Sequence, residues 1–294
     1  MEKARGKRMQ KEEKVGNYQA TALQAALSMV LSLLFWLVLG PYFTNWFTRF
    51  SIPYLTANAP FLAMALGIIV SGKLLLSSTP ISVITDYRSF RFSLFFKSFG
   101  AYLLVAILFL LLELLLEPDT YQVSEAPLSA RFILVPLVLL LTPLQTSSEE
   151  VVFRILPLRV VQGKWLQRGI IRNLLACMLS ALLFTAPHLA NREFSNAENP
   201  TIVLIYYAIC GALVSALSIM SGGFEPALAI HAANNLFIAL ICNYQGSSLP
   251  SIPILTTTKP TGTFFDLLQL LIGLAVVSLV VYQHITLQSR SPKL

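Results

Sequence analysis

Eight apolar segments in the sequence approach the length of a membrane-spanning helix. A helix needs about 20 apolar residues to cross the roughly 30 Å hydrocarbon core of a bilayer. Backbone polar groups in lipid must be hydrogen-bonded within the protein, so segments of this length are predicted to be helices. The segments are Ala20–Leu39, Ala57–Leu76, Phe99–Leu116, Phe132–Leu144 with an apolar extension to about Val161, Leu174–Ala190, Thr201–Met220, Pro226–Cys242 and Phe264–Tyr282. We therefore predict an all-α polytopic membrane protein with about eight transmembrane helices.

The composition excludes the other broad classes of protein. Of the 294 residues, 55% are hydrophobic and 12% are charged, and the mean hydropathy is +0.69. Soluble domains carry about 25% charged residues, and disordered chains are rich in charge and poor in apolar residues. The three cysteines lie in apolar stretches, where a thiol behaves as a small hydrophobic group, so no disulfide framework is predicted.

Lysine and arginine concentrate in alternate segments between the predicted helices. Cytoplasmic segments of membrane proteins carry such an excess, so both termini are predicted to be cytoplasmic. The same bias explains the formal net charge of +7, and we expect contact with the lipid bilayer and no nucleic-acid partner. The basic side holds Lys3, Arg5, Lys7, Arg8, Lys11, Lys14, Lys73, Arg88, Arg91, Lys97, the stretch from Arg154 to Arg172, Arg290 and Lys293.

Two adjacent glutamates near the end of the fourth segment form the first candidate site. Charged groups inside a span cost about 2.5–3.5 kcal/mol each near the helix centre, so they are functional candidates. On a helix, Glu150 and Arg154 stand one turn apart and can form an ion pair. Glu149 points about 100° away and is left as a candidate general base. A salt-bridged helix end at the membrane surface is the alternative explanation.

Two further polar motifs lie in later apolar segments. Phe184 and His188 are four residues apart, and His231 and Asn235 share one helix face at the same spacing. Imidazole and carboxylate groups serve as ligands and bases in zinc hydrolases, and an Asn amide can donate to an oxyanion. A lone histidine on an apolar helix is more often hydrogen-bonded across the bundle than used as a ligand, so each motif alone is a weak signal. Together with Glu149, the motifs suggest hydrolysis of a peptide bond within the membrane.

Straight helices would keep the two histidines apart. If both segments cross in the same direction, His188 lies about 20 Å along its helix and His231 about 8 Å along, at a rise of about 1.5 Å per residue. Helix tilt, a later entry of one helix or a break at a proline such as Pro187 is needed to bring them together.

Three motifs occur in a fixed order on successive predicted helices. They are Glu-Glu-x-x-x-Arg at Glu149–Arg154, Phe-x-x-x-His at Phe184–His188 and His-x-x-x-Asn at His231–Asn235. This pattern resembles the signature of the CPBP intramembrane proteases, also called the ABI or CAAX prenyl protease type II-like family. The resemblance covers about residues 130–245. It divides the chain into a basic cytoplasmic tail (1–19), three N-terminal transmembrane helices (20–130), a CPBP-like catalytic core of helices four to seven (131–245), and a last helix with a short tail (246–294).

The resemblance implies an intramembrane endopeptidase that cleaves membrane-anchored or lipidated peptides. By this resemblance, Glu149 and His188 would activate the attacking water. His231 and Asn235 would stabilise the tetrahedral oxyanion. Three residues are expected to support the site: Glu150, Arg154 and Phe184.

The family motifs leave the role of a metal undecided. In one mechanism His188 and His231 hold a divalent metal such as zinc; in the other, the glutamate works without a metal. The sequence departs from the family pattern in two places. Ile155 follows Arg154 where the family often has Gly, and Pro187 precedes His188. Neither departure removes a reacting group, but both can alter the path of a helix.

Two functions of other classes compete with the protease. The first is a non-catalytic membrane scaffold of the same fold that binds partner helices. It would not need all four of the predicted catalytic residues, Glu149, His188, His231 and Asn235. A proton-coupled transporter with a Glu/His relay is expected to show repeat symmetry, and none is visible in the sequence. The sequence therefore favours the protease.

Overall fold

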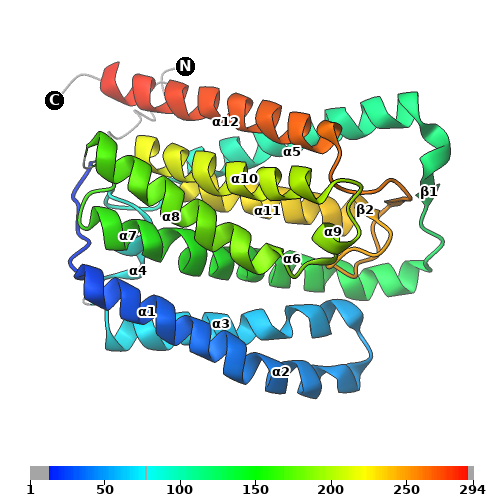
Figure 1. Cartoon of the computed structure of the whole chain (residues 1–294), viewed down its shortest axis with the longest axis horizontal. Coiled ribbons are helices and arrows are strands. Elements are labelled where there is room, and N and C mark those ends of the chain that lie inside the picture. Colours follow the sequence, from blue (N-terminus) through cyan, green and yellow to red (C-terminus); the bar gives the residue numbers. More distant parts are fainter. Residues whose placement is uncertain (1–12, 77, 168, 291–294) are drawn as a thin grey trace, which may run out of the picture.

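The computed structural model describes residues 13–76, 78–167 and 169–290, which form a bundle of helices with one small sheet (Figure 1). The predicted all-α polytopic fold is confirmed. Most of the predicted basic tail (1–19) lies outside the described residues, as does Lys293.

Helices make up most of the described chain, and several of them begin at residues that favour a helix N-terminus. Thr21 caps the first helix with a capping box. Pro53, Pro80 and Pro200 each occupy a first helical position, where the missing N–H is tolerated. The α-helices are α1 (Ala22–Leu34), α2 (Gly40–Phe47), α3 (Pro53–Leu74), α4 (Pro80–Ile84), α5 (Phe92–Leu116), α6 (Leu128–Glu150), α7 (Leu156–Gln162), α8 (Ile170–His188), α9 (Arg192–Ser195), α10 (Pro200–Ser221), α11 (Glu225–Leu240) and α12 (Phe264–Arg290). Two π-helical turns, η1 (Phe35–Leu39) and η4 (Val151–Ile155), and two 3₁₀ turns, η2 (Thr48–Phe50) and η3 (Pro118–Thr120), join some of them.

Seven helical stretches within the described residues are long and apolar enough to cross a membrane. They match seven of the eight predicted segments. The first stretch continues through η1 and α2 to Phe50, and the fourth continues through η4 to Gln162. The predicted segment Pro226–Cys242 differs, because it forms the 16-residue α11 and then enters a strand. At about 1.5 Å per residue, α11 is too short to span a bilayer alone.

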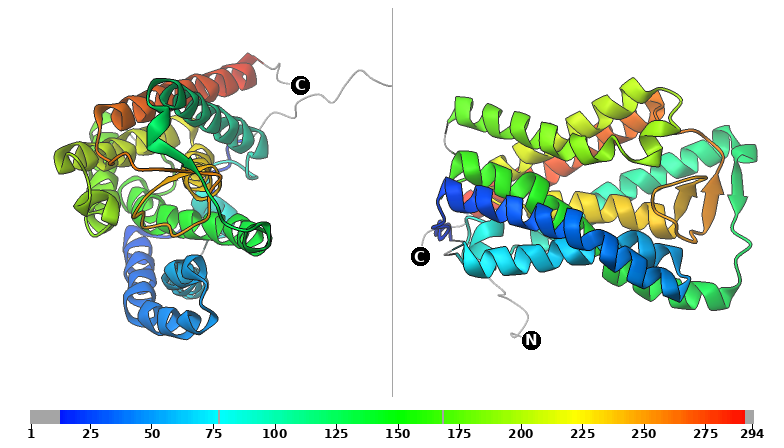
Figure 2. Two further views of the ribbon diagram at one scale, coloured as in Figure 1. Left: turned by 90° about the vertical axis from the view of Figure 1, so that its right-hand side faces the viewer. Right: turned by 60° about the horizontal axis from the view of Figure 1, so that its bottom comes forward.

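The helices pack in three groups, as Figures 1 and 2 show. The hairpin of α1 to α3 lies on one flank and packs against α6 and α7. The helices α6, α7 and α8 form the middle, and α5, α10, α11 and α12 form the other flank. Helix α11 packs against both α5 and α6, and α10 packs against α8 and α12. This arrangement surrounds α11 with other helices.

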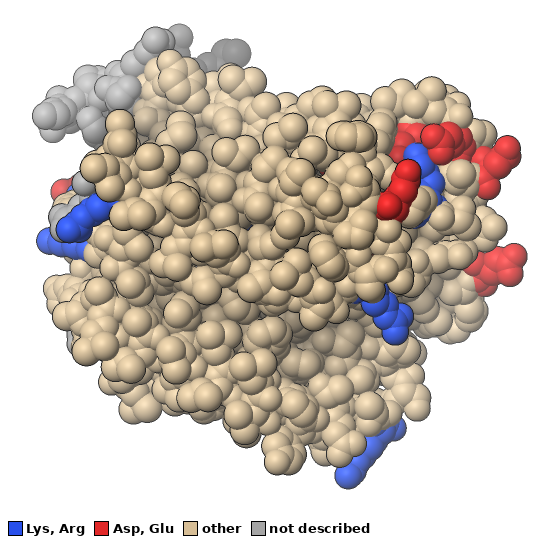
Figure 3. Space-filling model, in the orientation of Figure 1, with Lys and Arg blue, Asp and Glu red and all other residues tan. Residues whose placement is uncertain are grey.

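A small sheet covers one end of the bundle, which we call the sheet end (Figure 2). Its strands are β1 (Tyr121–Val123), β2 (Cys242–Tyr244) and β3 (Leu255–Thr257), in the order β1-β3-β2. Strand β1 is antiparallel to β3, with Tyr121 opposite Thr257, and β2 is parallel to β3. The face in Figure 3 is uncharged over its centre, and its acidic side chains gather toward the sheet end.

A buried ion pair fixes where α11 begins. Arg91 Nη2 lies 2.7 Å from Glu225 Oε2, and Arg91 also donates to the Ser221 carbonyl. Glu225 is fully buried, so α11 starts inside the bundle and not at its surface. His231 follows Glu225 by only six residues, yet it reaches the depth of His188 at the end of the 19-residue α8. The late start of α11 therefore removes the separation that straight, full-length spans would impose on the two histidines.

Candidate active site

A cavity of about 460 Å³ lies among α3, α5, α6, α8, α10 and α11 and extends to the sheet end. Its far part is lined by residues of the sheet and the loops beside it, such as Tyr121, Thr257 and Lys259. All seven residues predicted to form or support the site line this one cavity: Glu149, Glu150, Arg154, Phe184, His188, His231 and Asn235.

A chain of hydrogen-bonded charged groups crosses from α6 to α11. Glu150 pairs with Arg154 as its i,i+4 spacing predicts, and both side chains are almost fully buried. The other oxygen of Glu150, Oε1, lies 2.9 Å from Nδ1 of His231. Nε2 of the same imidazole lies 3.3 Å from Oε2 of Glu149. His231 thus connects the two glutamates, and Glu149 keeps its second oxygen for another partner.

The π-helical turn η4 begins directly after the two glutamates. Such turns are rare and frequently occur at functional sites. Arg154 lies in this turn, with its guanidinium 4.6 Å from the centre of the Phe184 ring and one nitrogen 3.4 Å from the Cys210 carbonyl oxygen. The turn therefore lets one arginine neutralise Glu150 and also contact α8 and α10.

His188 is held at the end of α8 by its own backbone and by aromatic neighbours. Its Nδ1–H donates to the Phe184 carbonyl at 2.6 Å, which leaves Nε2 as the acceptor nitrogen. The ring stacks on Phe184 with 4.8 Å between centroids, and Tyr207 lies 4.2 Å away on α10. Phe184 also contacts His231 edge-on at 5.7 Å, so it brings the two histidines to one place.

Asn235 lies one helical turn beyond His231 and is 9% exposed. Its Oδ1 accepts a hydrogen bond from Nδ2 of Asn234, and Tyr102 donates to Asn234. Within the described residues, no hydrogen bond uses the Nδ2 of Asn235. The amide can therefore donate to a group that enters the cavity.

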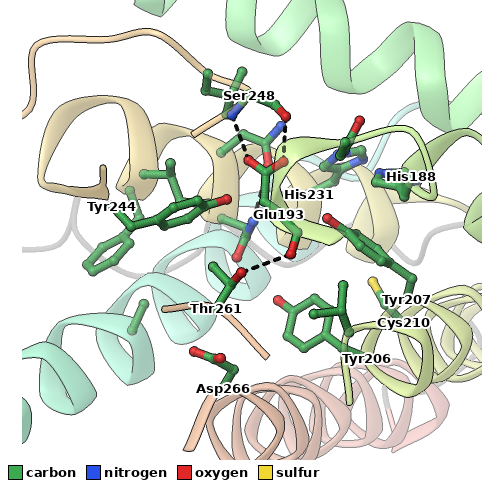
Figure 4. Close-up of a pocket in the computed structure, with 18 of the residues that line it drawn as sticks. His188, Glu193, Tyr206, Tyr207, Cys210, His231, Tyr244, Ser248, Thr261 and Asp266 are labelled. Atoms are coloured by element: carbon green, nitrogen blue, oxygen red, sulfur yellow. Dashed lines mark hydrogen bonds between the residues drawn. The ribbon is translucent and has the colours of Figure 1, made fainter. Parts of the chain in front are cut away.

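Several residues that line the cavity were not singled out in the sequence. Tyr207 stands in a long apolar run, where nothing marks it as part of the site. Figure 4 shows Glu193 beside the cavity, hydrogen-bonded to Ser248 and Thr261. These bonds tie α9 to the loop after β2 and to the segment before α12, contacts that sequence spacing does not indicate. Gln145 lies one turn before Glu149, so helical spacing could have found it.

The donors in the cavity do not form a metal site in this arrangement. The described residues contain no group of three or more His, Cys, Asp or Glu side chains placed to hold a metal ion. Both ring nitrogens of His231 face carboxylates. Nε2 of His188 is therefore the imidazole nitrogen that is left to bind a metal. A catalytic zinc has three protein ligands, and the described donors do not supply three in this arrangement.

Comparisons with known proteins locate a family domain in this region. Residues 128–237 match the family described as type II CAAX prenyl endopeptidase Rce1-like. A curated relative, the uncharacterized protein YyaK of Bacillus subtilis (strain 168), is 29% identical over 190 residues, or 64% of this chain and 61% of YyaK. The match therefore spans less than two thirds of that relative. No solved structure matches the chain significantly. The matched region holds all three motifs and nearly coincides with the stretch 130–245 marked by the sequence, so residues 128–237 of this chain are similar to the Rce1-like family of type II CAAX prenyl endopeptidases.

Proposed function

We propose that this chain is an intramembrane endopeptidase that cleaves membrane-associated peptides with a water molecule activated by Glu149 and His188. One observation carries the proposal. In a cavity bounded by apolar helices, Glu150 is paired with Arg154 and His231, whereas one oxygen of Glu149 has no partner among the described residues. A partly desolvated carboxylate of this kind can accept a proton from water.

In the proposed reaction, water adds to the carbonyl carbon of the scissile peptide bond. Glu149 takes one proton from the water, and Nε2 of His188 accepts a hydrogen bond from the other O–H and orients it. The new C–O bond gives a tetrahedral intermediate with a negative oxygen. When the C–N bond breaks, Glu149 returns the proton to the leaving amine. The products are one carboxylic acid and one amine.

His231 and Asn235 are proposed to stabilise the negative oxygen of the intermediate. The Nδ2 of Asn235 is a preorganised donor that makes no hydrogen bond within the described residues. His231 is fixed through Nδ1 by Glu150, and its Nε2, which lies 3.3 Å from Glu149, is proposed to donate to the negative oxygen once Glu149 has taken the proton from water. Donors fixed before the reaction are more effective than mobile ones, because no reorganisation is needed as charge develops.

The substrates are proposed to be membrane-anchored or lipidated peptides, as the family description suggests. If both termini are cytoplasmic, the sheet end faces the other side of the membrane. The cavity reaches the sheet end through Tyr121, Thr257 and Lys259. A peptide would then enter from the non-cytoplasmic side or laterally from the bilayer.

The scaffold and transporter alternatives explain less of the arrangement. A scaffold gives no reason to place Glu149, His188 and Asn235 around one cavity with unused hydrogen-bonding atoms. A transporter is expected to hold polar groups on pseudo-symmetric halves, whereas the four groups here come from α6, α8 and α11 of one region.

Terminal proteomics of membranes tests the proposed function. Cells that express the parent chain are compared with cells that express Glu149→Ala and with a control, Glu125→Ala, which removes an exposed glutamate outside the cavity. New protein termini are expected in the parent and Glu125→Ala membranes and are expected to be missing with Glu149→Ala. Identical termini in all three samples would favour the scaffold.

A further inference from the structure

Gln145 on α6 is a buried polar side chain in the cavity that the proposed chemistry does not use. It is 7% exposed and lines the cavity. Its Oε1 has no hydrogen-bond partner among the described residues. A buried polar atom without a partner costs about 1–3 kcal/mol, and such atoms are few in native proteins. An unpaired carboxamide in a cavity therefore calls for a partner that enters from outside.

The other buried atoms without partners do not share this location. Asn58, Gln162 and Thr185 each carry one such oxygen, but none of the three lines the cavity. Arg154 does line it, but its guanidinium is already held by Glu150. Among the described asparagines and glutamines, Gln145 is thus the one that lines the cavity and also carries a buried oxygen without a partner.

The helix geometry places Gln145 level with Asn235. Helices α6 and α11 pack against each other and run in opposite directions (Figure 1). Glu149 faces His231 across this contact. Gln145 lies four residues before Glu149, and Asn235 lies four residues after His231. Each is therefore about 6 Å nearer the sheet end than the Glu149–His231 pair. The carboxamides of Gln145 and Asn235 thus lie at the same height in the cavity, on facing helices.

We propose that Gln145 is a substrate-binding residue that holds a backbone peptide group next to the scissile bond. A carboxamide presents one acceptor and two donors, which matches the N–H and C=O of a peptide group. With Asn235 donating to the scissile carbonyl, Gln145 on the facing helix reaches the adjacent peptide group. This binding is independent of substrate side chains, so it suits an enzyme that accepts varied sequences. The inference rests on the proposed endopeptidase function.

The first arm of the test uses stability. Gln145→Leu removes the unpaired atom at similar volume, so the melting temperature in detergent is expected to stay equal or rise. The matched control is Gln162→Leu, which also removes a buried glutamine with an unpartnered oxygen, but breaks its hydrogen bond to Asn173. Gln162→Leu is expected to melt lower and, per folded molecule, to keep the parent activity. A lower melting temperature for Gln145→Leu with unchanged KM would show that Gln145 is structural and would overturn the proposal.

The second arm uses an internally quenched peptide that ends in a farnesylated CAAX box. Gln145→Leu is expected to raise KM about three- to tenfold, the effect of losing one uncharged hydrogen bond, with kcat little changed. The peptide is then N-methylated at one backbone amide at a time. One position is expected to raise KM with the parent and to have no further effect with Gln145→Leu. Additive effects at every position would contradict the proposed contact.

A third arm separates this inference from the function itself. In a background without Cys177, Cys210 and Cys242, Gln145→Cys and Asn235→Cys are treated with a small methanethiosulfonate reagent. Both are expected to react, because both positions face the cavity. If the parent does not cleave the farnesylated peptide, that substrate assignment fails, and this labelling still decides where Gln145 points. An unreactive cysteine at 145 beside a reactive one at 235 would overturn the inference alone.

Discussion

His231 on α11 hydrogen-bonds Glu150 on α6, with 2.9 Å between Nδ1 and Oε1, across 81 positions of sequence. Because Glu150 also pairs with Arg154, the imidazole is anchored to a side chain that cannot easily turn away. The contact links the two antiparallel helices in one register. Glu149 then faces the other nitrogen of His231, and the next turn of each helix brings in the two carboxamides. This hydrogen bond thus joins the groups on the two helices, together with the apolar packing of α6 against α11.

Replacing Glu149 with Gln tests the assignment of the general base. The amide keeps the shape of the carboxylate but cannot take a proton, so kcat is expected to fall by about 10²- to 10⁴-fold. Folding is expected to be retained, since Glu149 does not share the buried pair with Arg154. Cleavage of a substrate peptide and thermal unfolding in detergent are measured together. A purified Glu149→Gln variant that cleaves as fast as the parent would refute the mechanism.

Arg154→Ala tests the separate roles of the two glutamates. It leaves the fully buried Glu150 carboxylate with one cationic partner fewer, and breaking a buried ion pair costs about 3–5 kcal/mol. Arg154→Ala is therefore expected to melt at a lower temperature than Glu149→Ala in the same detergent. The double variant Glu150→Ala with Arg154→Ala removes both charges and is expected to recover part of the loss. Equal melting temperatures for the two single variants would instead indicate one shared acidic site.

Sequence spacing predicted the local parts of the site but not its long-range contacts. The Glu150–Arg154 pair follows from helical period alone, whereas the bond from Glu150 to His231 depends on how α6 and α11 pack. The segment Pro226–Cys242 was predicted to span the membrane, whereas α11 has 16 residues, begins inside the bundle and ends at Leu240, shortly before β2. His231 lies only six residues after the start of α11, and that start is held inside the bundle by the Arg91–Glu225 pair. This pair joins residues 134 positions apart. Such tertiary contacts leave no periodic signal in the sequence.

Removal of metal ions tests which mechanism operates. The donors around His188 and His231 are not grouped as metal ligands, so turnover is expected to persist after incubation with 1,10-phenanthroline and dialysis. Elemental analysis of the dialysed protein verifies that metal has been removed. Loss of activity that added zinc restores would assign His188 and His231 to a metal.

Asn235→Ala tests the proposed oxyanion donor. Losing one such donor costs about 10²- to 10³-fold in kcat with little change in substrate binding. Asn234→Ala is expected to cost less, because Asn234 acts through its hydrogen bond to Oδ1 of Asn235. Asn235→Asp keeps the shape but removes the donor, so it is expected to be as impaired as Asn235→Ala. A kcat that is lower for Asn234→Ala than for Asn235→Ala would reverse the two assignments.

Gly211→Ala tests whether close packing of α8 and α10 positions His188. A Cβ at Gly211 would lie 2.6 Å from the Cα of Ala181, a backbone atom of α8. The helices must move apart, at a cost of about 1–3 kcal/mol for overpacking. Tyr207, one turn before Gly211, would then lose its 4.2 Å contact with the His188 ring. Both the melting temperature and turnover are therefore expected to fall.

The control is Gly100→Ala on α5, where a Cβ meets nothing within 4 Å. Because Ala favours a helix more than Gly does, Gly100→Ala is expected to melt no lower than the parent and to keep its activity. A Gly211→Ala variant with parental stability and turnover would show that the α8–α10 spacing is not what holds His188 in place.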